Sequence, residues 1–275
     1  MRSLLKFLIL LLAISPSLFV WAATSPDTNN RTEPSLPQVW APAGQTSESL
    51  VAPPAGLPRM APELALQTFQ QRAARQLSEP VSYSANTVVQ AELPDTSQRG
   101  EYQLRRRFIA PKTLLFTPVR FVGDNFVKSN IIARLLQTEV DHVNKGEGAR
   151  TAINEANYKF NYKGADTIDG VSVHVFHVKP RARRAGLFKG RIYLDASTGS
   201  LRRAEGSLVK TQSFFVKKID FVQDYADIDG YTLPVHTRSL AKTRLVGRAV
   251  VEIATDAYDL NTSASAQTHE PGGSE

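Results

Sequence analysis

Apolar runs of strand length, separated by turn residues, fill the second half of the chain. Within residues 158–208, runs rich in Val, Ile, Tyr and Phe are separated at Asp169-Gly170, at residues 180–186 and at residues 195–199. Asp-Gly between two such runs is a strong hairpin signal, because glycine supplies the positive φ of a tight turn. Within Lys189–Asp195 apolar and polar positions alternate, as they do in a strand with one buried face. The pattern predicts an antiparallel meander.

The flanking segments extend this sheet and add helices. Alternation predicts further strands over residues 81–93, 100–109, 112–122, 211–225, 231–240 and 244–258. Apolar residues at helical spacing predict a short helix after Pro62 and a longer one over residues 130–143. Ser129 is expected to cap the longer helix, and Lys145-Gly146 is expected to end it. The prediction is one α+β domain over residues 63–260, with eight to ten antiparallel strands and two or more helices.

Residues 1–22 have the pattern of a secretory signal peptide. Basic Arg2 and Lys6 precede an apolar run, and Val20-Trp21-Ala22 offers the small-residue spacing that signal peptidase recognises. An uncleaved membrane anchor is the alternative, since the apolar run is nearly long enough to span a bilayer. The chain has no cysteine, which excludes an acylated lipoprotein and disulfides. We therefore expect an exported protein, periplasmic or secreted.

Composition separates both ends of the chain from the domain. Residues 23–62 hold half of the 16 prolines and predict a disordered spacer, and residues 261–275 predict a disordered tail. Residues 63–260 carry 29 of the 33 basic and 21 of the 26 acidic residues, a net charge of +8. This excess indicates either an anionic partner or a solvated basic surface.

The basic residues occur in clusters, and the loop cluster Arg181, Arg183 and Arg184 is the candidate contact to an anionic surface. The headgroups of an anionic membrane or an acidic envelope polymer would suit it, and a plain solvated loop is the alternative. Nucleic acid is not expected, because aromatic residues are not interleaved with the basic ones and the chain carries an export signal.

Signatures of catalysis are absent from the sequence. The chain lacks G-x-S-x-G and S-x-x-K at turn positions, a P-loop and any cysteine nucleophile. His174 and His177 lie three apart in a predicted strand, so they should point to opposite faces. Glu139 and His142 are expected on the exposed side of their helix. We therefore expect no enzyme, no cofactor and no metal site.

Three segments resemble exported bacterial proteins with the lipoprotein-carrier fold, namely relatives of LolA and LolB and outer-membrane lipoprotein-sorting proteins. The segments are FKGRIYLDASTGSLRRAEG, FFVKKIDFVQDYADIDGYTLPVHTRS and RLVGRAVVEI, within residues 158–260. The resemblance implies a strongly curved antiparallel sheet, an incomplete β-barrel, wrapped over helices around an apolar hollow. In that family the hollow holds acyl chains or another hydrophobic ligand. The missing lipidated cysteine and the Pro-rich spacer depart from the family pattern.

The resemblance implies a non-enzymatic envelope protein that binds a lipid, a lipoprotein acyl chain or another hydrophobic ligand. An interaction or sensor module that binds an envelope protein without cargo is the alternative. Apolar residues of the later strands are candidates for the lining of the hollow: Phe215, Ile219, Phe221, Val235, Val251 and Ile253. The helix over residues 130–143 could instead cover them entirely.

Limited proteolysis tests the predicted domain boundaries. We expect a stable core that begins near Pro62 and ends near Leu260, because the flanking segments lack the periodicity that a packed element needs. Mass spectrometry of the resistant fragment gives its ends. A core that begins before Val39, or a lower melting temperature when the spacer of residues 23–62 is deleted, would contradict the prediction.

Overall fold

The computed structural model describes residues 59–211, 216–244 and 247–260. The predicted signal peptide, most of the spacer and the tail lie outside these residues. The helical elements are α1 (Pro62–Ser78), a 3-10 turn (Pro94–Thr96), α2 (Asn125–Val127), a π-helical segment (Lys128–Ile132), α3 (Ala133–Asn144) and α4 (Gly148–Thr151). The strands are β1 (Tyr83–Leu93), β2 (Gln98–Ile109), β3 (Thr113–Gly123), β4 (Tyr158–Ile168), β5 (Val171–Pro180), β6 (Phe188–Asp195), β7 (Leu201–Leu208), β8 (Val216–Ile228), β9 (Tyr231–Thr243) and β10 (Arg248–Asp259).

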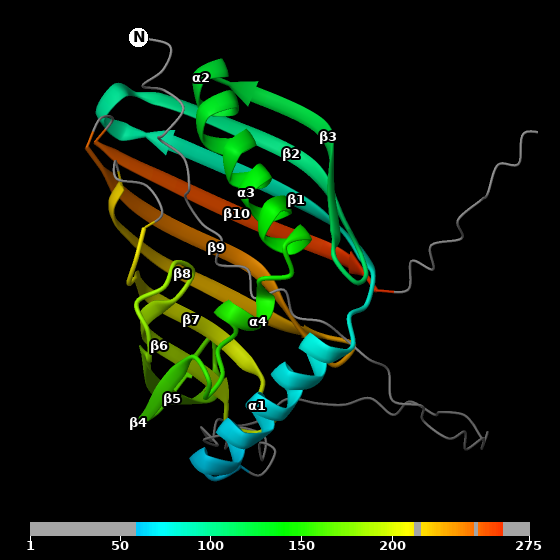
Figure 1. The fold of residues 1–275 in the computed structure, drawn as a ribbon, viewed down its shortest axis with the longest axis vertical. Coiled ribbons are helices and arrows are strands. Elements are labelled where there is room, and N and C mark those ends of the chain that lie inside the picture. Colours follow the sequence, from blue (N-terminus) through cyan, green and yellow to red (C-terminus); the bar gives the residue numbers. More distant parts are fainter. Residues whose placement is uncertain (1–58, 212–215, 245–246, 261–275) are drawn as a thin grey trace, which may run out of the picture.

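All ten strands form one antiparallel sheet in the order β3-β2-β1-β10-β9-β8-β7-β6-β5-β4. Strands β4 to β10 follow one another as the predicted meander. Strand β1 joins the meander at β10, where Ala91 pairs with Val251. The sheet is curved and unclosed, with β3 and β4 as its two edges (Figure 1). The predicted α+β fold with an incomplete barrel is confirmed.

Two hairpins of the sheet turn at the Asp-Gly pairs seen in the sequence. Asp169 and Gly170 have φ of 49° and 79°, and Asp229 and Gly230 have φ of 51° and 83°. Positive φ at both central residues is the geometry of the turn whose twist matches the flanking strands. These turns fix the β4–β5 and β8–β9 pairings.

The longer helical unit begins earlier than predicted. It starts at Asn125, continues through the π-helical segment and ends in α3, so Ser129 lies inside the helix and caps nothing. The expected cap at Ser129 is therefore wrong. The reason lies in Asp124, whose carboxylate accepts a hydrogen bond from the Arg99 amide at 2.9 Å and ties the start of the helix to β2. The predicted end is confirmed, because Gly146 adopts φ of 65° directly after the helix.

Helices cover only one face of the sheet. The unit α2–α3 crosses β1, β2 and β10, whereas α1 lies at the other end, near β6 and β7 (Figure 1). Arg72 of α1 donates to the Ser200 hydroxyl at 2.6 Å and pairs with the Asp227 carboxylate at 2.5 Å. These contacts fasten α1 to the start of β7 and to the β8–β9 turn. We call the face under the helices the concave face and the opposite face the outer face.

Candidate functional site

The concave face carries two apolar clusters. In the first, Ile131, Ile132 and Leu135 of the helical unit pack with inward side chains of β1, β8, β9 and β10. In the second, Phe69 and Ala73 of α1 pack with inward side chains of β4 to β8. Each cluster excludes water through helix–sheet contact, since all strands of the described residues belong to one sheet.

The candidate lining residues are divided between these clusters. Ile219, Val251 and the partly buried Ile253 belong to the first cluster. Phe221 belongs to the second and meets Phe188 edge-to-face, with ring centroids 5.0 Å apart. Val235 is half-buried, where the β8–β9 register shifts, and Phe215 lies outside the described residues. Helices therefore cover those candidate lining residues that are described and buried. The sequence left this open as the alternative to an open hollow.

A band of buried polar side chains crosses the middle of the concave face. Thr87 and Thr255 lie opposite each other on β1 and β10, with their hydroxyl oxygens 3.3 Å apart. Thr237 of β9 is buried beside them in the sheet, and Gln223 of β8 accepts a hydrogen bond from Tyr225 at 2.9 Å. The band supplies donors and acceptors inside an otherwise apolar face.

A buried ion pair joins the sheet to α3. Arg106 of β2 and Glu139 of α3 are both over 90 % buried, and their nitrogen and oxygen atoms are 2.5 Å apart. Arg106 also donates to the Tyr83 hydroxyl at 3.0 Å, and its guanidinium lies 5.5 Å from the Phe116 ring centre. Burial alone would lower the pKa of Arg106, but the charge of Glu139 outweighs it and raises the pKa. The arginine therefore stays charged within an aromatic pocket.

Glu139 and His142 were expected on the exposed side of the helix, and this expectation is wrong. Both side chains are 6 % exposed. They follow Leu135 and Leu136 at helical spacing, so they continue the apolar stripe toward the sheet. A signal was present in β2 as well, because Arg106 follows Leu104 by two residues and therefore lies on the same inward face of the strand. A buried arginine on a strand requires a carboxylate facing it.

His142 connects α3 to α4. Its Nδ1 lies 3.4 Å from the Glu147 carboxylate, and its Nε2 lies 3.4 Å from the Thr151 hydroxyl. Burial lowers the pKa of His142, and the neighbouring carboxylate of Glu147 offsets only part of this effect. The neutral imidazole is therefore the favoured form in the folded protein.

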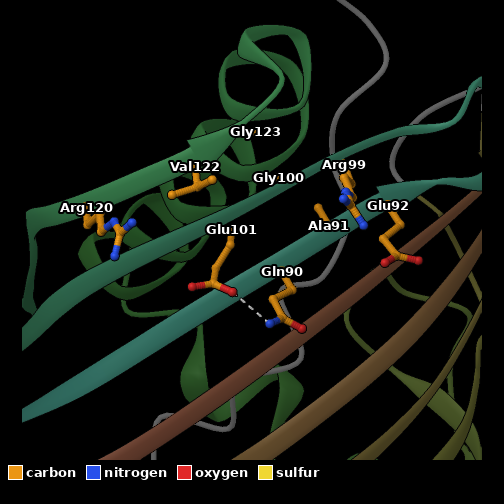
Figure 2. Close-up of a pocket in the computed structure, with 9 residues that line it drawn as sticks. All are labelled: Gln90, Ala91, Glu92, Arg99, Gly100, Glu101, Arg120, Val122 and Gly123. Carbon is orange, nitrogen blue, oxygen red and sulfur yellow. Dashed lines mark hydrogen bonds between the residues drawn. The ribbon is translucent and has the colours of Figure 1, made fainter.

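The outer face holds an open hollow of about 370 Å³ across β1, β2 and β3. Figure 2 shows Glu101 and Gln90 joined by a hydrogen bond there, with Arg120 and Val122 on β3 beside them. Gln103 also donates to Glu101, at 2.9 Å, and these bonds together with the Arg120 charge lower the pKa of that carboxyl. The hollow is polar and lies on the opposite side of the sheet from the candidate lining.

The three loop arginines predicted to contact an anionic surface all bind the chain itself. Arg181 donates to the Glu155 carbonyl at 2.6 Å, and Arg183 donates to the Val209 carbonyl at 3.0 Å. Arg184 is half-buried and donates to the Asn157 side chain at 2.5 Å. Each guanidinium keeps further N–H groups for an outside partner. The loop is nevertheless held by these bonds, which the sequence did not reveal.

The predicted histidine geometry is retained, since His174 and His177 hold positions of opposite parity on β5. His174 is buried and its Nε2 lies 2.9 Å from the carbonyl oxygen of Met60, just before α1. Within residues 59–211, 216–244 and 247–260, no three His, Cys, Asp or Glu side chains gather as metal ligands would. In the same part of the chain, no helix combines the length and the apolar character needed to cross a bilayer.

Replacing Glu139 tests the buried ion pair. Glu139→Gln leaves the buried Arg106 charge without a counter-charge, so the free energy of unfolding in urea should fall by about 3 kcal/mol or more. The matched control Glu252→Gln breaks the exposed pair with Arg238 and should cost about 0–1 kcal/mol. The double variant Arg106→Met/Glu139→Leu should recover much of the loss. A Glu139→Gln cost no larger than that of the control would contradict the prediction.

His142 makes stability depend on pH. The unfolded chain binds a proton at His142 near pH 6.5, whereas the folded protein does so only at lower pH, because burial lowers the pKa. Stability is therefore complete above about pH 6.5 and falls as the pH decreases through that value. The melting temperature should drop more between pH 7.5 and pH 5.5 in the parent than in His142→Gln. Equal drops in the two proteins would refute this prediction.

Comparison with known proteins finds one family model and several solved structures that are similar to this chain. Residues 151–258, which span nearly all of β4 to β10, match the model of a protein family of unknown function, DUF5686. No curated protein matches the chain. A solved outer membrane lipoprotein-sorting protein domain from Vibrio parahaemolyticus is similar, with 14% identity, a TM-score of 0.41 and coverage of 74% of this chain and 95% of that one.

Two further solved structures are similar to this chain. A DUF1329 family protein from Desulfovibrio piger has 13% identity and a TM-score of 0.37, with coverage of 74% of this chain and 92% of that one. A LolA superfamily protein from Nitrosomonas europaea has 12% identity and a TM-score of 0.35, with coverage of 72% and 92% respectively. Two of these three solved proteins carry the names of the group that the sequence resembles, and the fold itself is shown by the single curved, unclosed antiparallel sheet (Figure 1).

Proposed function

We propose that this chain is an exported, non-enzymatic envelope protein that binds a lipid, a lipoprotein acyl chain or another hydrophobic ligand on its concave face. The proposal is supported by the way in which helices cover that face. Apolar side chains of the curved sheet, Ile219 and Val251 among them, are buried by helices alone. A helix can move away from a sheet without breaking any hydrogen bonds between strands. If strands covered the face instead, their movement could break such hydrogen bonds.

An acyl chain could bury the strand side chains that the helical unit now covers. Ile131, Ile132 and Leu135 now occupy the space against Ile219 and Val251, and a hydrocarbon chain would bury the same strand side chains. Burial of apolar surface is worth about 25 cal/mol per Å², whichever apolar group supplies the contact. The π-helical segment Lys128–Ile132 lies within this unit, and such segments often occur at functional sites.

The polar band supports an amphiphilic ligand rather than a plain hydrocarbon. Thr87, Gln223 and Thr237 lie buried in the centre of the face, and Arg106 adds a positive charge beside α3. A ligand with one polar group and one or two acyl chains could bond to the band and lay its chains on the apolar clusters. This matches the composition of pockets that orient an apolar ligand with a few placed polar groups.

The proposal includes the partners expected from the sequence. Lipid or lipoprotein acyl chains are the cargo, an anionic membrane surface or an envelope protein is a further contact, and nucleic acid is not a partner. The candidate lining residues and the three loop arginines remain proposed contacts. A sensor module that binds an envelope protein without cargo remains the alternative function.

Two measurements test the cargo. Native mass spectrometry of protein purified from its host should show lipid that co-purifies with the folded chain. A photoreactive fatty acid should then attach to concave-face peptides that contain Ile219 or Val251, because an acyl chain there lies in contact with both side chains. The matched controls are the half-buried Val88 and Val222, which lie on the outer face of β1 and β8.

An empty native spectrum together with adducts spread equally over both faces would overturn the carrier proposal. The same result, combined with saturable binding of an envelope protein, would favour the sensor module.

A further inference from the structure

Exposed apolar side chains concentrate on the edge strand β3. Among the described residues five large hydrophobic side chains are exposed, and three of them belong to β3: Leu115 (47 %), Val119 (69 %) and Val122 (52 %). Single exposed apolar residues are ordinary on protein surfaces, but several on one strand mark an interaction site.

Two arginines with no partner lie beside this apolar strand. Arg105 and Arg107 of β2 are exposed and flank the inward Arg106, so they point to the outer face. Arg107 lies opposite Leu115 in the β2–β3 register, and Arg105 lies opposite Thr117. Neither arginine side chain makes a hydrogen bond or an ion pair with any residue that the structure describes.

Three other outward arginines of the sheet are paired with acidic neighbours. Arg191 pairs with Glu205 at 2.6 Å, and Arg203 pairs with Asp224 at 2.5 Å. Arg238 pairs with Glu252 at 3.0 Å. At the β2–β3 edge, by contrast, Arg105 and Arg107 have no acidic partner among the described residues, and apolar side chains are exposed beside them. We call Arg105, Arg107, Leu115, Val119, Arg120 and Val122 the outer patch.

The edge itself is poorly suited to a partner strand. Pro118 has no N–H to donate, and it sits in the middle of β3. A register shift follows at the same point, between the Leu104–Pro118 and Gln103–Arg120 pairs, and makes Val119 the extra residue of a bulge. Such features prevent strand addition along an exposed edge. The patch therefore fits a partner that is recognised by charge and apolar contact rather than by strand pairing.

We propose that the outer patch docks this protein on an anionic lipid bilayer. Arg105, Arg107 and Arg120 would contact headgroup phosphates, while Leu115 and Val119 enter the boundary between headgroups and acyl chains. Guanidinium groups suit phosphate because their paired N–H donors match its oxygens. The acidic Glu101 lies opposite Val122 in the β2–β3 register and close to Arg120, and its carboxylate is bonded to Gln90 and Gln103.

This inference goes beyond the proposed cargo, because the patch lies on the face opposite the candidate lining. A docked protein would keep its concave face and helices away from the headgroups. The two proposals can also fail separately, since adsorption to vesicles and labelling by a photoreactive fatty acid are different measurements.

Co-sedimentation with vesicles of phosphatidylglycerol and phosphatidylcholine tests the docking. The parent should bind, the binding should fall as salt rises, and vesicles of phosphatidylcholine alone should bind far less. Arg105→Ser/Arg107→Ser should weaken binding about 30-fold, since each arginine near an anionic surface contributes roughly fivefold. The control Arg191→Ser/Arg238→Ser removes the same net charge from paired positions and should change the binding little.

A second variant separates the apolar contribution. Leu115→Ser/Val119→Ser should keep the salt dependence but lose the binding that remains at high salt, because it leaves every charge in place. Circular dichroism should show all variants folded, since they replace exposed side chains.

Three outcomes would overturn the proposal. The first is equal binding by Arg105→Ser/Arg107→Ser and the parent. The second is an equal loss in the Arg191→Ser/Arg238→Ser control, which would show that net charge alone matters. The third is a loss confined to Arg181→Ser/Arg183→Ser/Arg184→Ser, which would assign the membrane contact to that loop instead.

Discussion

A single sheet with one apolar face must have that face covered by something other than itself. Ten strands pair edge to edge here without closing, so no second sheet is left to bury the inward side chains. Two helical elements provide the cover, α1 over β4 to β8 and the α2–α3 unit over β1, β2 and β8 to β10. The core, the buried ion pair and the proposed ligand site all follow from this arrangement.

The two helical elements are fastened to the sheet differently. Contacts of Arg72 to Ser200 and Asp227 hold α1 at its exposed side. The α2–α3 unit is bound to the sheet by the buried ion pair between Glu139 of α3 and Arg106 of β2. Removing two charges from water costs several kcal/mol per ion, so the pair adds little net stability compared with an apolar pair of similar volume. An apolar interface alone would allow the helix several registers.

Local sequence patterns predicted the sheet well, whereas they predicted side-chain contacts poorly. The Asp-Gly turns at residues 169 and 229 depend on backbone geometry, which neighbouring residues determine. The ion pair of Arg106 with Glu139 depends on where a helix crosses a strand over 30 residues earlier, and charged residues are usually assigned to the surface. The loop bonds of Arg181 and Arg184 likewise join segments that the sequence separates. The expected cap at Ser129 is wrong because the helix begins earlier, where the Asp124 carboxylate accepts a hydrogen bond from β2. No local sequence pattern predicts this contact.

The pairing of β1 with β10 gives the chain a late step in folding. Val89 of β1 pairs with Ile253 of β10, so β1 gains its second neighbour only when the last strand is available. Closing so long a loop costs entropy before any contact compensates for it, which makes such topologies slow to fold. During synthesis, which begins at the N-terminus, β1 to β3 and α3 would therefore form before β10 is available to pair with β1. A delay of this kind would leave inward side chains of β1, such as Val89, exposed to water until β10 is available.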